Sequence, residues 1–290
     1  MKYLETLSRR QSLQTLAIMG ASAVTFPQGA VLSAQAAAPT GVKDEDIFQF
    51  ALNLEYMETE YYLRATTGAG LKSSDAGPDA GEVSGGHKVP FKTKAIGEFA
   101  EELAENELAH VRFYRKTLGE AAVSRPTIDF EGGFAKVAKA AGLGTDFDPF
   151  ANEMNFLLGG MLFEDVGVTA YKAAAPLIKK KEFLEAAAGI LAVEAYHMGM
   201  ARSQLYMMGE AAWKAANAIS DARDKLDGGA NLDQGIVRDG KANFVPSDAN
   251  GIAFSRTPQQ VLRIVYLTDK DGVPGGGFYP KGMNGTLQIT

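Results

Sequence analysis

Two copies of one four-residue spacing, Glu-x-x-His, constrain this chain more than any other feature. They are Glu107-Leu-Ala-His110 and Glu194-Ala-Tyr-His197, and they use two of the three histidines in the sequence. Residues three apart lie on one face of an α-helix, so each copy directs a carboxylate and an imidazole to the same side. Two such helices, combined with an inward glutamate on each of two further helices, form a dinuclear metal site in a four-helix bundle. The rest of the sequence must therefore supply two more helices of this kind.

The first of them is predicted over residues 44–67, where apolar side chains recur at helical spacing and Asp44 is the expected N-cap. Glu55 and Glu58 fall on the apolar face of this helix, whereas Glu60 points away from it. Burying a carboxylate costs several kcal/mol or more unless it is paired or binds metal, which makes Glu55 a candidate ligand. For Glu58 the alternative is a solvated place at the edge of the face.

Three further helices are predicted over residues 93–118, from Asp148-Pro149 to Pro176, and over residues 181–217. The first and last of these carry the Glu-x-x-His copies on their apolar faces. Glu164 is the sole glutamate along the apolar face of the helix between them. Residues 120–147 form a crossover with one short helix, so the fold class is all-α, a four-helix bundle with a long crossover.

A weak internal repeat relates the two halves of this bundle. Glu55 is followed seven residues later by Tyr62, and Glu164 is followed seven residues later by Tyr171. Each of these helices precedes a Glu-x-x-His helix, so two related hairpins face each other around a pseudo-two-fold axis. The alternative is that inward tyrosines are simply common in helical bundles.

The chain divides into three parts. Residues 1–38 are interpreted as an export signal of the twin-arginine type, with Arg9-Arg10, a mildly apolar run, and Ala34-Gln35-Ala36 as cleavage site. A general secretory signal is the alternative, and the apolar run is too interrupted for a stable membrane span. Residues 39–222 form the bundle, and residues 223–290, rich in Gly, Asn and Asp, form an irregular C-terminal extension that caps it. The expected location is periplasmic or secreted.

Residues 68–90 are predicted to be an irregular loop, because they contain six glycines and two prolines. At over twenty residues the loop is longer than most connections, so it is either a lid near the site or a tolerated insertion. The third histidine, His87, lies in this loop and is expected at the surface. In the extension, residues 257–268 are predicted to form a short helix or strand.

Composition restricts the chemistry. The 290 residues carry a net charge of −6, which gives no reason to expect a nucleic-acid partner. Cysteine is absent, so the ligands of any metal must be nitrogen and oxygen atoms. The expected partners are metal ions and a small-molecule oxidant, and a homodimer is the working hypothesis for the oligomeric state.

The set Glu55, Glu107-x-x-His110, Glu164 and Glu194-x-x-His197 resembles the ligand pattern of the ferritin-like di-metal carboxylate superfamily. Longer segments, such as FALNLEYMETEYYLRATTG, FEDVGVTAYKAAAPLI and AAAGILAVEAYHMGMARSQLY, are similar to the ferritin-like family of secreted bacterial and plant desiccation-related proteins. The resemblance implies that Glu55 and His110 hold one metal ion, Glu164 and His197 hold the other, and Glu107 and Glu194 bridge them. It also implies that Tyr62, Tyr171 and Glu58 support these ligands. One departure concerns Asn106 and Val193, which stand where many di-iron members carry an acidic residue.

Three functions follow from these expectations. The first is an oxidoreductase with two iron or manganese ions, acting on O₂ or H₂O₂ in a ferroxidase-like or catalase-like reaction linked to oxidative or desiccation stress. The second is a non-enzymatic stress-protective or envelope protein that keeps the metal for stability. The third, a metal-free polar network that binds a solute or partner, is disfavoured because four glutamates are hard to neutralise with two histidines.

Overall fold

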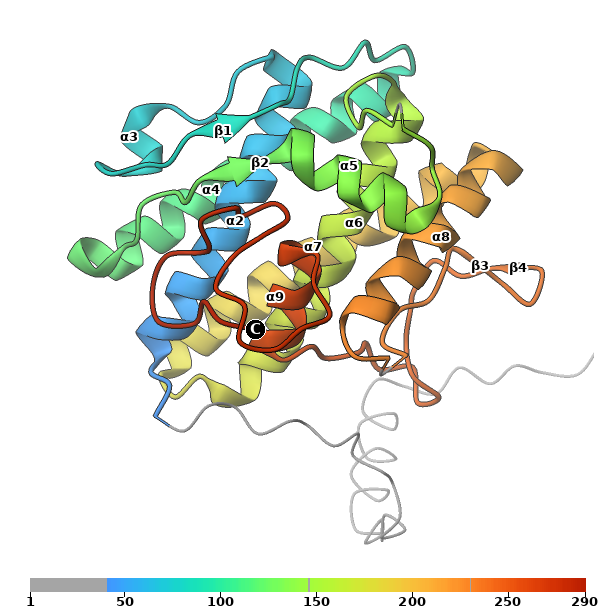
Figure 1. Cartoon of the computed structure of the whole chain (residues 1–290). Helices are drawn as coiled ribbons and strands as arrows, with labels where there is room; N and C mark the ends of the chain where they lie inside the picture. Colours follow the sequence, from blue (N-terminus) through green and yellow to red (C-terminus); the bar gives the residue numbers. More distant parts are fainter. Residues whose placement is uncertain (1–40, 146, 230) are drawn as a thin grey trace, which may run out of the picture. The chain divides into compact units, whose positions relative to one another are not determined.

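Four long helices, α2, α4, α6 and α7, form the core of the protein (Figure 1). The computed structural model describes residues 41–145, 147–229 and 231–290, so the predicted export signal lies outside the described residues. The elements are α2 (Asp44–Thr67), α3 (Ser73–Ala76), β1 (Val83–Ser84), α4 (Lys94–Leu118), η1 (Gly119–Ala121), β2 (Ile128–Asp129), α5 (Phe130–Ala141), α6 (Glu153–Ala174), η2 (Ala175–Leu177), α7 (Lys181–Met207), α8 (Glu210–Leu226), β3 (Val237–Arg238), β4 (Lys241–Ala242) and α9 (Pro258–Tyr266). The predicted all-α fold class is confirmed.

The bundle consists of two hairpins. Helix α2 packs along α4, and α6 packs along α7, while α2 also contacts α6 and α4 contacts α7. The crossover between the hairpins contains β2 and α5, and α5 packs against α8 (Figure 1). Each of the four long helices therefore has a face toward a common interior, as the sequence pattern predicted.

Two predicted helix boundaries are wrong. Helix α6 begins at Glu153 with Asn152 as its N-cap, because the Asp148 carboxylate instead accepts a hydrogen bond from the Phe150 amide at 2.9 Å and holds a turn. The predicted helix over residues 181–217 is two helices, α7 and α8. Gly209, with φ of 90°, separates them, since this backbone conformation does not belong to a continuous α-helix.

Helix α2 is buried on almost all sides, which corrects the expectation for two of its acidic residues. Glu60 does not face solvent: it is fully buried and paired with Arg125 and, at 2.9 Å, with Arg64. Asp44 is the first helical residue rather than the N-cap, and its carboxylate accepts hydrogen bonds from the Lys179 and Lys180 amides. The expectation that one face of α2 is buried and the other is solvated is wrong, because other segments cover its outer face.

The segment from residue 68 to 90 is fixed to the bundle rather than open. Its strand β1 pairs in parallel with β2, and Asp75 accepts two hydrogen bonds of 2.9 Å from Arg112 on α4. His87 is exposed, as predicted, and its Nε2 lies 2.9 Å from Asp148 Oδ2. These contacts favour the packed insertion over the lid.

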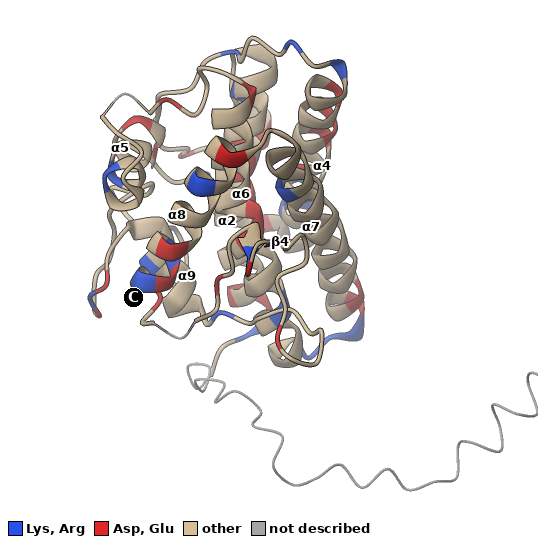
Figure 2. Cartoon of the chain, turned by 90° about the vertical axis from the view of Figure 1, so that its right-hand side faces the viewer, with Lys and Arg blue, Asp and Glu red and all other residues tan. Residues whose placement is uncertain are grey.

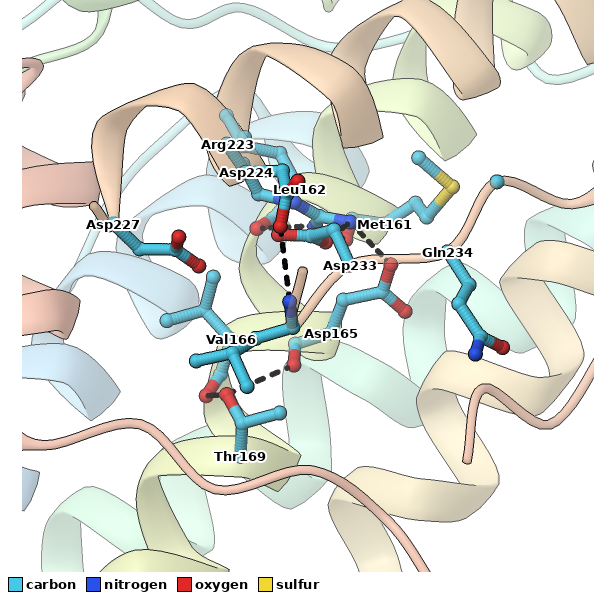
Figure 3. Close-up of polar contacts among 12 residues, drawn as sticks. Met161, Leu162, Asp165, Val166, Thr169, Arg223, Asp224, Asp227, Asp233 and Gln234 are labelled. Atoms are coloured by element: carbon cyan, nitrogen blue, oxygen red, sulfur yellow. Dashed lines mark hydrogen bonds and ion pairs between the residues drawn. The ribbon is translucent and has the colours of Figure 1, made fainter. Parts of the chain in front are cut away.

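The C-terminal extension is held to the bundle by buried ion pairs. Three fully buried arginines lie among three buried aspartates, and Figure 3 shows Arg223 beside Asp165 and Asp233. The pairs are Arg202–Asp165 (2.9 Å), Arg223–Asp165 (2.5 Å), Arg223–Asp233 (2.6 Å), Arg256–Asp227 (2.9 Å) and Arg256–Asp233. Because Asp165 belongs to α6, this network joins the extension to the helix that also carries Glu164.

The end of the extension contacts the middle of α2. The side-chain amide of Asn53 donates to the Asn284 carbonyl at 2.8 Å and accepts from the Asn284 amide at 2.9 Å. The Tyr279 hydroxyl donates to the Asn53 carbonyl at 2.7 Å. The predicted cap is therefore packed against the bundle two residues from Glu55, and residues 258–266 within it form the helix α9.

Candidate metal centre

Six side chains predicted as metal ligands lie together in the interior of the bundle. Glu55 comes from α2, Glu107 and His110 from α4, Glu164 from α6, and Glu194 and His197 from α7. All six are buried, and the four glutamates are fully so. Acidic positions in the middle of the bundle helices are visible in Figure 2.

These side chains form two overlapping groups. One group is Glu55, Glu107, His110 and Glu194, and the other is Glu107, Glu164, Glu194 and His197. Within each group the candidate ligand atoms all lie within 4.8 Å of one another. Because Glu107 and Glu194 belong to both, the two groups are adjacent and share two carboxylates, and each group could hold a metal ion.

The imidazoles point their Nδ1 atoms toward the carboxylates. His110 Nδ1 lies 3.1 Å from Glu55 Oε2 and 3.1 Å from Glu107 Oε2. His197 Nδ1 lies 3.0 Å from Glu107 Oε1 and 3.4 Å from Glu164 Oε2. Glu107 thus turns one oxygen toward each histidine, which is the orientation that a bridging carboxylate requires.

Two tyrosines each hold an outer glutamate on the opposite helix. Tyr62 of α2 donates a hydrogen bond of 2.5 Å to Glu164 on α6, and Tyr171 of α6 donates to Glu55 on α2. The matched offset in the sequence therefore corresponds to a reciprocal exchange between the two hairpins. Such hydrogen bonds fix the orientation of a ligand carboxylate.

Glu58 is buried and close to this cluster. The alternative of a solvated place at the edge of the helix face is wrong, since only 3% of Glu58 is exposed. The residue lines a small cavity with Gly167 and Phe278. No hydrogen-bond donor among the described residues reaches its carboxylate. Burial, with added repulsion from Glu107 and Glu164, raises the pKa of Glu58 well above its ordinary value.

The electrostatics of the metal-free cluster show how strongly it attracts positive charge. Burial raises the pKa of Glu55 to about 8, and burial with neighbouring carboxylates raises the pKa of Glu194 well above its ordinary range. Burial disfavours charge on the histidines, but the facing carboxylates outweigh it and raise the pKa of His110 to about 11 and of His197 to about 10. Burial likewise opposes the charge of Glu107, but the two imidazoles outweigh it and lower its pKa. Protons therefore occupy the cluster when no metal does.

Five buried atoms in the cluster form no aligned hydrogen bond with a described residue: Glu107 Oε1, Glu164 Oε2, Glu194 Oε1, Glu194 Oε2 and His197 Nδ1. His197 Nδ1 still faces the Glu107 and Glu164 oxygens as an ion pair, whereas neither oxygen of Glu194 has a close partner. A buried polar atom left unpaired costs about 1–3 kcal/mol, so the Glu194 carboxylate indicates that a further group belongs there. The donors are carboxylate oxygen and imidazole nitrogen, a set that suits iron or manganese. The residues therefore fit a dinuclear centre of either metal.

Comparison with known proteins agrees with this geometry. The ferritin-like domain family matches residues 43–207, from the start of α2 to the end of α7. The chain belongs to this family. The ferritin-like catalase Nec2 of Nesocodon mauritianus is 28% identical over 269 residues, covering 84% of each chain. The desiccation-related protein PCC13-62 of Craterostigma plantagineum is 31% identical over 244 residues, covering 76% of each chain. No solved structure matches this ferritin-like protein.

Two polar neighbours of the cluster were not identified from the sequence as supporting groups. Tyr114 of α4 donates a hydrogen bond of 2.8 Å to Tyr171, which extends the chain of hydroxyls that ends at Glu55. The Asn106 amide lies 3.2 Å from His197 Nε2, so the position where many di-iron members are acidic still contacts a histidine. The presence of Tyr114 four residues after His110 was the available signal, because that spacing keeps both on one helical face.

A third functional position, Gly167 on α6, could not be recognised by its chemistry. A Cβ atom added there would lie 2.2 Å from Glu194 Oε2, so only glycine leaves room for this shared carboxylate. The signal in the sequence is a glycine inside a helix, three residues after Glu164, where glycine costs about 1 kcal/mol relative to alanine.

A second acidic cluster, Asp224, Asp227 and Asp233, has the spacing of a cation site. Arginines already neutralise it, since Arg223 and Arg256 pair with Asp233 and Arg256 also pairs with Asp227. It therefore belongs to the ion network of the extension. Within the described ranges, no helix of this ferritin-like protein combines the length and the apolar character that crossing a membrane requires.

Proposed function

We propose that this ferritin-like protein binds two iron or manganese ions in the six-residue cluster and disproportionates hydrogen peroxide. The observation that carries the proposal is the pair of overlapping ligand groups that share Glu107 and Glu194. The similarity to a relative named ferritin-like catalase supports peroxide as the substrate.

Each residue of the cluster has a defined part in this proposal. Glu55 and His110 would hold one ion, Glu164 and His197 the other, and Glu107 and Glu194 would contact both. When bound, the two ions would supply the redox chemistry that exchanges two electrons between peroxide molecules. Tyr62 and Tyr171 keep the outer carboxylates in place through their hydrogen bonds.

Two other functions compete with the catalase-like reaction. The same oxygen and nitrogen ligands also suit a ferroxidase-like oxidation of Fe(II) by O₂. A non-enzymatic role in stress protection draws on the similarity to a relative named desiccation-related protein. In that role the metal would only stabilise the bundle.

Export and assembly belong to the same proposal. We propose that residues 1–38 direct the protein to the periplasm or the exterior, which detection of the processed protein in cell fractions tests. The homodimer also stays a proposal, and sedimentation velocity of the purified protein tests it.

The deciding experiment combines elemental analysis with two assays on purified protein. We expect iron or manganese in the wild type, rapid consumption of H₂O₂, and loss of both metal and activity in Glu107→Ala. The matched control is Glu105→Ala, which removes an exposed glutamate two residues away on α4. Fe(II) oxidation without peroxide consumption would favour the ferroxidase, and bound metal with neither activity would favour the structural role. Absence of both metals from the wild type would refute the site.

A further inference from the structure

Two small apolar cavities lie at the end of the bundle where α2 begins and α6 ends. Each has a volume of about 30 Å³, and they share the side chains of Ile47, Phe50, Ala170 and Ala174. The outer cavity reaches the half-buried Leu287 of the extension. The two cavities are therefore neighbours, and the one without Leu287, called the inner cavity, has the more buried lining.

The inner cavity ends at the hydroxyl groups that support the metal cluster. Tyr114 and Tyr171 both line it, and Leu54, the neighbour of Glu55 in sequence, forms part of the same wall. The Tyr114 hydroxyl donates to Tyr171, and the Tyr171 hydroxyl donates to Glu55, so both hydroxyl protons are already used. The cavity is thus one side chain away from a proposed ligand.

The volume and the lining identify the chemistry of the molecule that fits. A volume of about 30 Å³ is enough for a small molecule, since about 10–15 Å³ of such volume holds one water. A water molecule needs two to four polar partners, whereas apolar gases enter cavities that lack them. The walls are aliphatic and aromatic apart from the two tyrosines and Arg256, and the Arg256 guanidinium is already paired with Asp227 and Asp233. Peroxide is polar and does not suit this lining.

We propose that these cavities form a binding site and passage for dioxygen between the cluster and the surface. The source of the gas rests on the proposed function: two H₂O₂ molecules give two H₂O and one O₂, as one peroxide loses two electrons and two protons to the other. The apolar cavities give the apolar product a route away from the metal cluster.

Crystals of the metal-loaded protein pressurised with xenon test the site directly, because xenon reports small apolar cavities by its strong scattering. We expect xenon in both cavities of the wild type, and dioxygen at the same positions in crystals pressurised with oxygen. Ala170→Phe, which fills the wall common to both cavities, should abolish these peaks. The matched control Ala192→Leu, an exposed position on α7, should retain them.

A wild type without xenon in these cavities overturns the inference, as does a filled variant that keeps both peaks. If Ala170→Phe does not fold, Ala174→Leu makes the same test with a smaller side chain. Xenon binding does not depend on turnover, so its failure is distinct from failure of the proposed function. Xenon in the cavities of a protein that consumes no peroxide would support the site and refute only the reaction.

Discussion

Replacing Gly167 with alanine displaces a proposed ligand without changing any ligand residue. The new Cβ would lie 2.2 Å from Glu194 Oε2, whereas ordinary contacts begin near 3.4 Å, so the carboxylate has to retreat by about 1.2 Å. The obstructing atom is the end of a flexible side chain, so the backbone of α6 stays in place and the Glu194 side chain moves instead. A displacement of about 1 Å is large compared with the precision that a metal ligand needs.

The expected result is opposite for folding and for metal binding. Alanine is about 1 kcal/mol more favourable than glycine inside a helix, so the metal-free variant should be no less stable than the wild type. Metal affinity should fall about 10–100-fold, the range seen when the support of a metal ligand is removed. Thermal unfolding with and without chelator, together with metal titration against a competing chelator, measures both quantities.

A matched control separates the displaced ligand from a general effect of the added methyl group. Gly189 lies on α7, and a Cβ added there meets no atom within 4 Å. Gly189→Ala should therefore stabilise the protein by the same amount, about 1 kcal/mol from helix propensity, and leave metal affinity unchanged. Wild-type metal affinity in Gly167→Ala would refute the assignment of Glu194 as a ligand shared by both ions.

Three further predictions concern charge. Metal uptake should release protons, because His110 and His197, with pKa values raised to about 11 and 10, and Glu55, with a pKa raised to about 8, must lose theirs to bind. Below pH 8 these three protons leave for two ions, so affinity per ion should rise by more than about tenfold per pH unit. Calorimetry in buffers of different ionisation enthalpy measures the release. The metal-free protein should lose stability in urea as pH rises from about 5 to 8. Glu55 binds its proton up to a pKa of about 8 when folded but only to 4.5 when unfolded, so the folded state holds more protons there, as it does at the histidines. Arg256→Met should destabilise the protein by about 3–5 kcal/mol in chemical denaturation, because buried Asp227 loses its ion-pair partner and buried Asp233 keeps only Arg223.

Each of these predictions has a control. His87→Ala should leave the proton release unchanged, since this histidine is exposed and does not belong to the cluster. Binding heats that do not depend on the buffer would contradict the first prediction. Stability that increases over the same pH range would contradict the second, and bound metal should flatten the dependence. Lys214→Ala removes an exposed ion pair with Glu210 and should change little; a loss equal to that of Arg256→Met would contradict the third.

The parts of the fold that the sequence predicted are those governed by local periodicity. Residues 44–67 and 94–118 repeat their apolar side chains at helical spacing, and glutamates on the same faces were the candidate ligands. Because a helix fixes which residues share a face, Glu55 and Glu164 could be selected before their neighbours were known. The seven-residue offset to each tyrosine indicated support, although not that each tyrosine serves the opposite helix.

The errors arise where long-range contacts decide. Glu60 has a local partner, Arg64, but it looked solvent-exposed because its second partner, Arg125, lies 65 residues away, beyond any local pattern. Asp148 has the composition of an N-cap, but its carboxylate serves a turn and His87 instead. The arginine–aspartate network gave no signal at all, since its members are spread from Asp165 to Arg256 and none of them is unusual in its local sequence.

Charge balance connects the stability of the bundle with the proposed centre. The four glutamates proposed as ligands carry four negative charges when ionised, and two divalent ions would neutralise them with both histidines uncharged. Glu58 then adds a fifth carboxylate with no ion or donor assigned to it, and the low-polarity interior favours its protonated form. In the metal-free protein, protons on His110, His197 and Glu55 provide the compensating charge. The bundle can therefore fold before it binds metal, and metal uptake exchanges protons for cations in a site whose carboxylates are already positioned by Tyr62 and Tyr171.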